Sequence, residues 1–359
     1  MPLGALAHTP APSAMRSVTD FGVSATNADN TSQFNAAIQW ALTNHARIWN
    51  PFPITIAGTL VVNGSTVPQG FEIDGPGQIT ETGNNLPIFH FIAPAGGYME
   101  AIYVHNIAMI YANYQGTSEP NSACMAFDAD TAGGSIYNSR FDRIQCYGAR
   151  KGFAQVGSNG NMWGNRWTNL ICKRIAGACL DMQVGNGGQP NNYFGNVYAI
   201  NSSCADPYQF AFKLHTTLNL DNFEVNNISG CRLLYVAKGR SINIRNIRCE
   251  VCAVGTESVN GGLIEADGVG IHIEGFEAQQ ISPNMPGSNF FLFQDSATSG
   301  PPDVVTNVQY WNRATVTGTI YGVSSPTVHV YLQPVTNWQS APYGGDVAPG
   351  SNVTTIWAP

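Results

Sequence analysis

Apolar residues near the start of the chain follow two different spacings, and each spacing predicts a different element. One stripe recurs at intervals of three and four residues, as on one face of a helix: Phe34, Ala37, Ile38, Ala41 and Leu42. It predicts an amphipathic helix over 33–45, with its first turn capped by the hydroxyl of Thr31 or Ser32. The short runs expected to be extended strands around this helix are 18–23, 54–56 and 60–62.

Farther along, the chain repeats a unit that opens on asparagine. The anchoring residues Asn165, Asn196, Asn222 and Asn246 are separated by 31, 26 and 24 positions. Periods in the twenties with variable insertions are typical of a solenoid whose coils bury their faces only against neighbouring coils. Asparagine tolerates left-handed turns, and residues stacked about 4.8 Å apart can hydrogen-bond along the column. We therefore expect an all-β, right-handed, single-stranded parallel β-helix with the helix as its N-terminal cap.

Strand alternation then predicts which side chains face outward on successive coils. Along the first strands the expected inner residues are Val197, Phe223, Ile247 and Phe276, and the expected outer residues are Tyr198, Glu224, Arg248 and Glu277. Along the second strands the expected inner residues are Leu180, Met182, Phe212 and Leu214. The outer residues there are Asp181 and Gln183 beside Lys213 and His215, then Tyr235, then Glu265 and Asp267.

The alternation changes from about Pro301 onward. Segments 304–310, 314–320 and 327–332 are expected to form antiparallel strands, as a short C-terminal β extension. The predicted organisation is a flexible leader over 1–16, a capped β-helix over 17–300, and a β-rich closing or oligomerisation segment over 301–359.

Composition narrows the classes of partner. Only 11% of residues are charged, the formal net charge is −7 and the pI is near 5.4. Nucleic-acid binders show a basic face, so that class is excluded. The acidic balance also disfavours polyanionic substrates unless basic residues gather locally. No stretch approaches the roughly 20 apolar residues of a membrane span, and the first fifteen residues lack the pattern of a signal peptide.

Eight cysteines are spread over the middle of the chain. Those at positions comparable from coil to coil predict an internal ladder: Cys146, Cys172, Cys204, Cys231 and Cys252. Cys249 and Cys252 have the spacing of half a zinc site, but no second pair completes it. We therefore expect buried free thiols, with neither a metal nor a cofactor.

The motifs of residues 17–80 resemble a known N-terminal cap. A strand with Asp-Phe-Gly, a polar turn over 27–32, one amphipathic helix and the Pro-x-Gly and Ile-x-Gly turns of 66–75 are similar to the pectate-lyase-like superfamily. That group includes polygalacturonases, pectate lyases and bacteriophage tailspike depolymerases. The catalytic motifs of the first two are absent, so the resemblance is closest to the tailspikes. It implies a parallel homotrimer located on a virion tail or otherwise outside the cell.

Glycosidic hydrolysis needs one carboxylic acid to protonate the leaving oxygen and one carboxylate as base or nucleophile. The candidate catalytic residues are Asp181, Glu224, Glu265 and Asp267. Glu265 and Asp267 lie two apart on one strand face, and Glu224 is expected beside Arg248, which would hold it ionised. The candidate substrate-binding residues are Lys213, His215, Arg248, Tyr198, Tyr235, and the loop aromatics Trp163 and Tyr193, with Phe194 nearby. The same outward charges also fit a solvated face.

The predicted function is that of a tailspike-type depolymerase, which hydrolyses a bacterial surface polysaccharide internally without a cofactor. A polysaccharide lyase is the alternative, with His215 or Tyr235 as base and Lys213 or Arg248 neutralising a uronate. A non-catalytic glycan-binding virion β-helix is the alternative from a different class.

Overall fold

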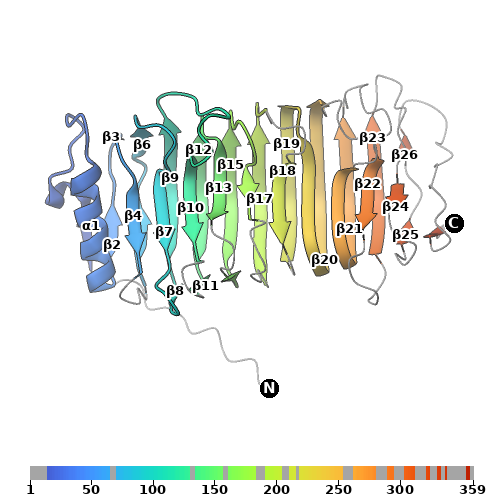
Figure 1. Ribbon diagram of the computed structural model, residues 1–359, viewed down its shortest axis with the longest axis horizontal. Helices are drawn as coiled ribbons and strands as arrows, with labels where there is room; N and C mark the ends of the chain where they lie inside the picture. The colour runs from blue at the N-terminus through green and yellow to red at the C-terminus, as the bar shows by residue number, and fades with distance from the viewer. Residues whose placement is uncertain are drawn as a thin grey trace, which may run out of the picture.

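Short parallel strands stack along one long axis, from helix α1 at one end to the last strands at the other (Figure 1). The computed structural model describes residues 14–64, 70–129, 134–156, 161–182, 191–203, 210–215, 218–253, 262–279, 289–294, 303–311, 321–323, 330–332, 336–337 and 353–355. Within these residues the strand pairings are all parallel, and the molecule is a right-handed β-helix as the sequence predicted.

Each coil contributes strands to three outward faces. Face 1 consists of β4 (Leu60–Asn63), β7 (Phe89–Ile92), β10 (Ala123–Asp128), β13 (Lys151–Val156), β16 (Leu180–Asp181), β18 (Phe210–His215), the first parts of β20 (Arg232–Ala253) and β21 (Gly262–Gln279), β22 (Asn289–Gln294) and β24 (Tyr321–Val323). Face 2 consists of β1 (Met15–Ser17), β2 (Arg47–Trp49), β5 (Glu72–Asp74) and the first halves of β9 (Tyr103–Tyr111), β12 (Arg140–Tyr147), β15 (Arg166–Lys173), β17 (Asn192–Ile200) and β19 (Leu218–Ser229).

Face 3 consists of β3 (Ile54–Ile56), β6 (Gln78–Glu81) and the second halves of β9, β12, β15, β17 and β19. Later parts of β20 and β21 continue faces 2 and 3, followed by β23 (Asp303–Trp311), β25 (Val330–Leu332), β26 (Thr336–Asn337) and β27 (Val353–Thr355). A separate small sheet contains β8 (Tyr98–Glu100), β11 (Ser135–Tyr137) and β14 (Asn161–Trp163).

One left-handed residue in each coil separates face 2 from face 3. These residues, the kink column, are Asn106, Arg143, Asn169, Asn196, Asn222, Asn246 and Gly275. Asparagine suits the position because its short side chain tolerates positive φ. Its amide also bonds along the stack: Asn222 Nδ2 donates to Asn196 Oδ1 at 3.0 Å, and Asn246 Nδ2 donates to Asn222 Oδ1 at 3.1 Å. The predicted asparagine column therefore exists.

The predicted first member of this column, Asn165, lies four residues before the left-handed residue of its coil. Asn165 lies next to Asn192 on the following coil, whose side chain accepts its backbone N–H at 2.9 Å. Asn169 holds the left-handed position, so the spacings to Asn196, Asn222 and Asn246 are 27, 26 and 24. Both asparagines belong to the same coil, and only pairing with the next coil tells them apart.

The interior is filled by columns of apolar side chains in register. Trp167 stacks on Phe141 with ring centroids 4.1 Å apart and on Phe194 at 5.8 Å. Phe194, expected among loop aromatics, is thus a core residue. The inner residues predicted by alternation are buried as well: Val197, Phe223, Ile247, Phe276, Leu180, Met182, Phe212 and Leu214. Such burial of large apolar surface is the main stabilising contribution to a solenoid.

The helix α1 (Thr31–Asn44) closes the first coil, and its predicted apolar stripe is buried against the core. Residues expected as a strand instead form the 3-10 helix η1 (Val18–Phe21). The expected cap was also wrong, because the Asp29 carboxylate, not a Thr31 or Ser32 hydroxyl, accepts the first-turn N–H of Thr31 at 2.9 Å. No helix in the described part of the chain has the length and hydropathy of a membrane span.

The C-terminal strands differ from the expected antiparallel arrangement. β23 pairs in parallel with β21, and β25 pairs in parallel with β23, so the solenoid stacking continues beyond residue 301. Residues 314–320 lie outside the described residues. At the other end, β1 begins at Met15, inside the expected leader, and pairs with β2. The division into three segments stays a prediction.

The cysteines are oxidised, which corrects the expectation of free thiols. Cys124 bonds to Cys146 and Cys172 bonds to Cys179. Cys231 and Cys249 are disulfide-bonded too, and among the described residues no cysteine is free. Cys146 and Cys172 do stack in register, but Ala199, Val225 and Cys249 continue that column. Cys204 and the Cys252 side chain lie outside the described residues.

Candidate functional site

The predicted carboxylates lie on two different faces of the solenoid. Glu224 is on face 3, in register with Tyr198 and Arg248. Asp181 and Glu265 are on face 1, in one column with Lys213 and Tyr235. Two strands of the same coil carry these columns, and the apolar interior lies between them. They therefore cannot act together on one bond.

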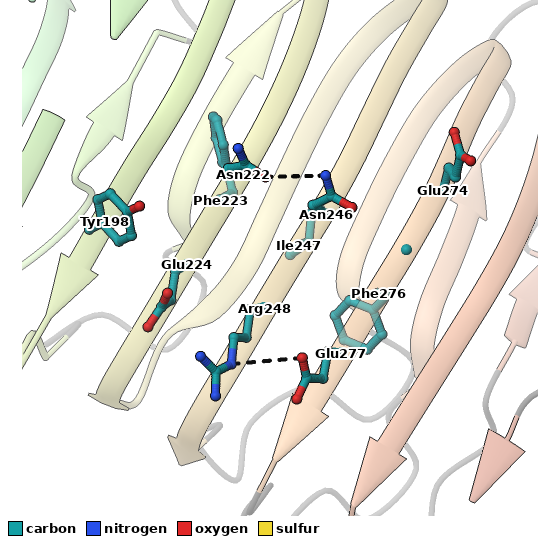
Figure 2. Close-up of a pocket in the computed structure, with 11 residues that line it drawn as sticks. Tyr198, Asn222, Phe223, Glu224, Asn246, Ile247, Arg248, Glu274, Phe276 and Glu277 are labelled. Atoms are coloured by element: carbon teal, nitrogen blue, oxygen red, sulfur yellow. Dashed lines mark hydrogen bonds and ion pairs between the residues drawn. The ribbon is translucent and has the colours of Figure 1, made fainter. Parts of the chain in front are cut away.

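A groove of about 470 Å³ follows the kink between faces 2 and 3 over strands β17, β19, β20 and β21 (Figure 2). It is lined by Tyr198, Asn222, Phe223, Glu224, Asn246, Ile247, Arg248, Glu274, Gly275, Phe276 and Glu277. The left-handed residues turn the chain so that outward side chains of both faces border the groove. Three predicted site residues, Tyr198, Glu224 and Arg248, are brought together here.

The carboxylates of the groove alternate with a guanidinium along one column. Arg248 lies between Glu224 and Glu277 in register, as Figure 2 shows. Its Nε is 3.8 Å from Glu277 Oε2, and one terminal nitrogen is 3.9 Å from Glu250 Oε2. Glu224 lies beside Arg248 in register, as the sequence predicted, but among the described residues it forms no ion pair. Partly exposed pairs of this length contribute little to stability.

The opposite wall supplies amides and a further carboxylate. Asn222 and Asn246 present side chains of the kink column, and Glu274 faces Arg245 with Nε and Oε2 3.7 Å apart. Amides and carboxylates can bind sugar hydroxyls as acceptors, and the amides donate as well. Glu274, Asn222 and Asn246 were not predicted as site residues. The asparagine repeat was the available signal, but it was interpreted as a device of the fold alone.

On face 1, two of the three expected carboxylates are held in ion pairs. Asp181 Oδ2 is 2.8 Å from Lys151 Nζ. Glu265 is 7% exposed and forms an ion pair with Arg232, itself 6% exposed. A buried carboxylate bonded to a guanidinium is a structural group whose removal leaves an unpaired charge. Glu265 was expected to face solvent, and the structure instead buries it.

The candidate bases for a lyase are poorly suited to that role. Burial raises the pKa of Tyr235, and the negative charges of Asp267 and Glu265 raise it further, so the phenolate is scarce. His215 was expected to point to the surface but is only 4% exposed. Lys213 is half-buried beside Asp181 and Tyr235 in register. Gln183 lies outside the described residues.

The predicted aromatics occupy two other places. Trp163 is 37% exposed and stacks on Tyr137, with ring centroids 4.4 Å apart, on the small sheet. Tyr193 lies on face 2, where the Arg166 guanidinium sits 5.0 Å from its ring centroid. Residues 157–160 and 183–190 of the two predicted loops lie outside the described residues. Neither aromatic borders the groove of Figure 2.

One cluster in the described part of the chain has the donor atoms for a cation. Glu72, Asp74 and His105 offer ligand atoms within 4.8 Å of one another. Arg47 forms ion pairs with both carboxylates, and His105 Nε2 is 2.7 Å from Glu72 Oε1. The guanidinium thus supplies the positive charge that a metal would bring. We interpret the cluster as an internally neutralised ion network.

Comparisons with known proteins agree on the fold. No family model matches the sequence, and no curated protein matches it. Among solved structures, ORF18 of Geobacillus virus E2 aligns over 91% of this chain and 62% of its own length, with TM-score 0.50 and 10% identity. The tailspike protein of an Acinetobacter phage aligns over 96% of this chain and 59% of its own, with TM-score 0.51 and 11% identity.

The catalytic unit of a GH87 α-1,3-glucanase from Streptomyces thermodiastaticus aligns over 96% of this chain and 68% of its own, with TM-score 0.50 and 13% identity. This chain spans about three fifths of the length of the two phage proteins. Identities this low show a shared architecture. The chain is a parallel β-helix, with a fold similar to those of a phage tailspike protein and a GH87 α-1,3-glucanase.

Proposed function

We propose that the chain is an endo-acting glycoside hydrolase of tailspike type that cuts a bacterial surface polysaccharide in the groove of Figure 2. The observation that carries the proposal is the column in which Glu224 and Glu277 flank Arg248 along an open groove. Hydrolysis of a glycosidic bond needs two carboxyl groups on opposite sides of that bond. Similarity in fold to a tailspike protein and to an α-1,3-glucanase supports the substrate class.

The spacing of the two carboxylates favours inversion of the anomeric carbon. Glu224 and Glu277 are two strands apart, which places their α-carbons about 9.6 Å apart. Inverting enzymes hold their carboxyl groups roughly 6.5–9.5 Å apart to leave room for water, and retaining enzymes hold them closer. We assign Glu277, which has Arg248 as counter-ion, as the base, and Glu224 as the acid.

In this mechanism Glu224 donates its proton to the glycosidic oxygen as the carbon–oxygen bond breaks. Glu277 takes a proton from a water molecule that attacks the anomeric carbon from the other side. Tyr198 and the amides of Asn222 and Asn246 position the sugar rings and hydroxyls. One water is added for each bond cut. The disulfides further support a location in an oxidising environment such as outside the cell.

The test is digestion of a panel of capsular and O-antigen polysaccharides, with products analysed by mass spectrometry and ultraviolet absorbance. We expect fragments that carry one added water, and a loss of about 100-fold or more for Glu224→Gln and for Glu277→Gln, the usual scale of acid–base catalysis. The exposed carboxylate of Asp20, on η1, gives the control Asp20→Asn, which should keep full activity.

Other outcomes separate the alternatives. Fragments that lack the water and absorb as unsaturated uronates would make the protein a lyase. Tight glycan binding without new reducing ends would make it a binding spike. Full activity in both glutamine variants, with loss in Asp181→Asn, would move the chemistry to face 1 and refute the groove as its site.

A further inference from the structure

Two arginines lie side by side on face 2, and the described residues supply neither with an acidic partner. Arg140 and Arg166 are direct register partners on β12 and β15, and both are exposed. Neither guanidinium takes part in an ion pair within the described residues. Like charges opposite one another on adjacent strands destabilise a sheet. The pair therefore has no evident folding role, on a protein whose net charge is −7.

The carboxylate two residues after Arg140 on the same strand is already engaged. Asp142 accepts hydrogen bonds from Thr168 Oγ1 at 2.6 Å and Asn169 Nδ2 at 2.8 Å, and Arg143 Nε lies 3.0 Å away. Burial acts to raise the pKa of Asp142, but these hydrogen bonds and the Arg143 charge outweigh it, and the pKa is lowered. The carboxylate is thus ionised and directed at its own partners. It leaves the two arginines available to a ligand.

Tyrosines extend the arginine pair at both ends. Tyr103 precedes Arg140 in the column and Tyr193 follows Arg166, whose guanidinium lies 5.0 Å from the Tyr193 ring centroid. These four residues border a hollow of about 320 Å³ that is also lined by Asp142, Thr168, Asn169 and Asn196. Guanidinium groups bind carboxylates and sulfates through paired hydrogen bonds, and aromatic rings pack on the apolar faces of sugars.

We propose that this hollow binds an acidic sugar residue of the glycan, with its anionic substituent between Arg140 and Arg166. The inference deepens the proposed function and rests on it. Asn169 and Asn196 belong to the same kink column as Asn222, so the hollow lies on the same seam as the groove.

The hollow and the groove are close enough along the solenoid axis for one oligosaccharide to contact both. Arg166 and Glu224 are two coils apart, about 9.6 Å along the solenoid. A single oligosaccharide lying along the seam can therefore contact both places. The hollow would select acidic glycans and set their register over the carboxylates. The two arginines are the local basic residues that allow an anionic substrate despite the acidic net charge.

The test is isothermal titration of the full chain, in its Glu224→Gln form to prevent cleavage, with three probes. They are oligogalacturonate as the carboxylate, oligomeric dextran sulfate as the sulfate, and neutral dextran oligomers. We expect tighter binding of an anionic probe than of neutral dextran, weakened about tenfold or more in Arg140→Gln/Arg166→Gln. Lys173→Gln removes one exposed positive charge elsewhere on β15 and should leave binding unchanged.

The preferred anionic probe identifies the substituent. Equal binding of all three probes, or an equal loss in Lys173→Gln and the double variant, would overturn the proposal. The binding assay is independent of cleavage. Anion binding in this assay, together with no hydrolysis of any polysaccharide by the unsubstituted chain, would reject the hydrolase and keep this site. Cleavage of neutral glycans alone by the unsubstituted chain, without anion binding, would do the reverse.

Discussion

The left-handed asparagine of one coil should contribute measurably to the stability of the whole stack. Asn222 has φ +56°, donates to Asn196 at 3.0 Å and accepts from Asn246 at 3.1 Å. Alanine removes both hydrogen bonds, each worth about 0.5–1 kcal/mol at an exposed site. It also places a residue in the left-handed region at about 1 kcal/mol more than asparagine. Asn222→Ala should therefore lower the free energy of unfolding by about 2–3 kcal/mol.

Glycine separates the two contributions. Asn222→Gly loses the same hydrogen bonds but adopts positive φ freely, as Gly275 does at φ +78° in the same column. We expect it to be about 1 kcal/mol more stable than Asn222→Ala. Urea unfolding followed by circular dichroism gives all three values on one scale. If the alanine variant proves as stable as the glycine variant, backbone conformation is not what selects asparagine here.

Three further perturbations test the core and its charges. Replacing Cys124 and Cys146 by alanine should lower the free energy of unfolding by about 3 kcal/mol in the same assay, because the disulfide links residues 22 positions apart and so restricts the unfolded chain. An unchanged urea midpoint would show that the disulfide does not stabilise the fold. Glu265→Gln should lower the free energy of unfolding by about 3–5 kcal/mol, because it leaves Arg232 buried without its counter-ion. The double variant Arg232→Met/Glu265→Leu should recover most of that loss. A single variant as stable as the parent would contradict the structural role of the pair. Burial raises the pKa of Glu81 despite a hydrogen bond from Gly83, so the folded state binds this proton more tightly than the unfolded state. Its stabilising contribution is present below the unfolded pKa and is lost as pH rises through the folded pKa. Glu81→Gln should flatten the fall in stability that begins as the pH rises above the ordinary pKa of a glutamate, and identical pH profiles for parent and variant would count against this account.

Local alternation was enough to predict the coil and the direction of its side chains. Val197 and Phe223 were expected inside, with Tyr198 and Glu224 outside, and the structure agrees. The apolar stripe of helix α1 was predicted in the same way, and its residues are buried. These features depend on residues only a few positions apart, so the two-residue period of a strand and the 3.6-residue period of a helix can be read from the sequence alone.

Which residues of successive coils lie opposite one another was harder to predict, because loops of different length separate the strands. Asn169, not Asn165, holds the kink, and nothing local distinguishes the two. The cysteines were counted correctly but their oxidation was missed, since Cys124 and Cys146 meet only when β10 and β12 fold around one interior.

In the candidate site, too, some features follow from the pattern within one strand and others from the alignment of successive coils. The sequence by itself determined that Glu224 and Arg248 would lie in one outward column, because the coil period places them there. Only the tertiary structure decided that Glu265 is buried on another face, and that Arg140 and Arg166 stand together. Outward direction is a property of one strand, whereas burial, ion pairing and the meeting of distant charges depend on how successive coils align.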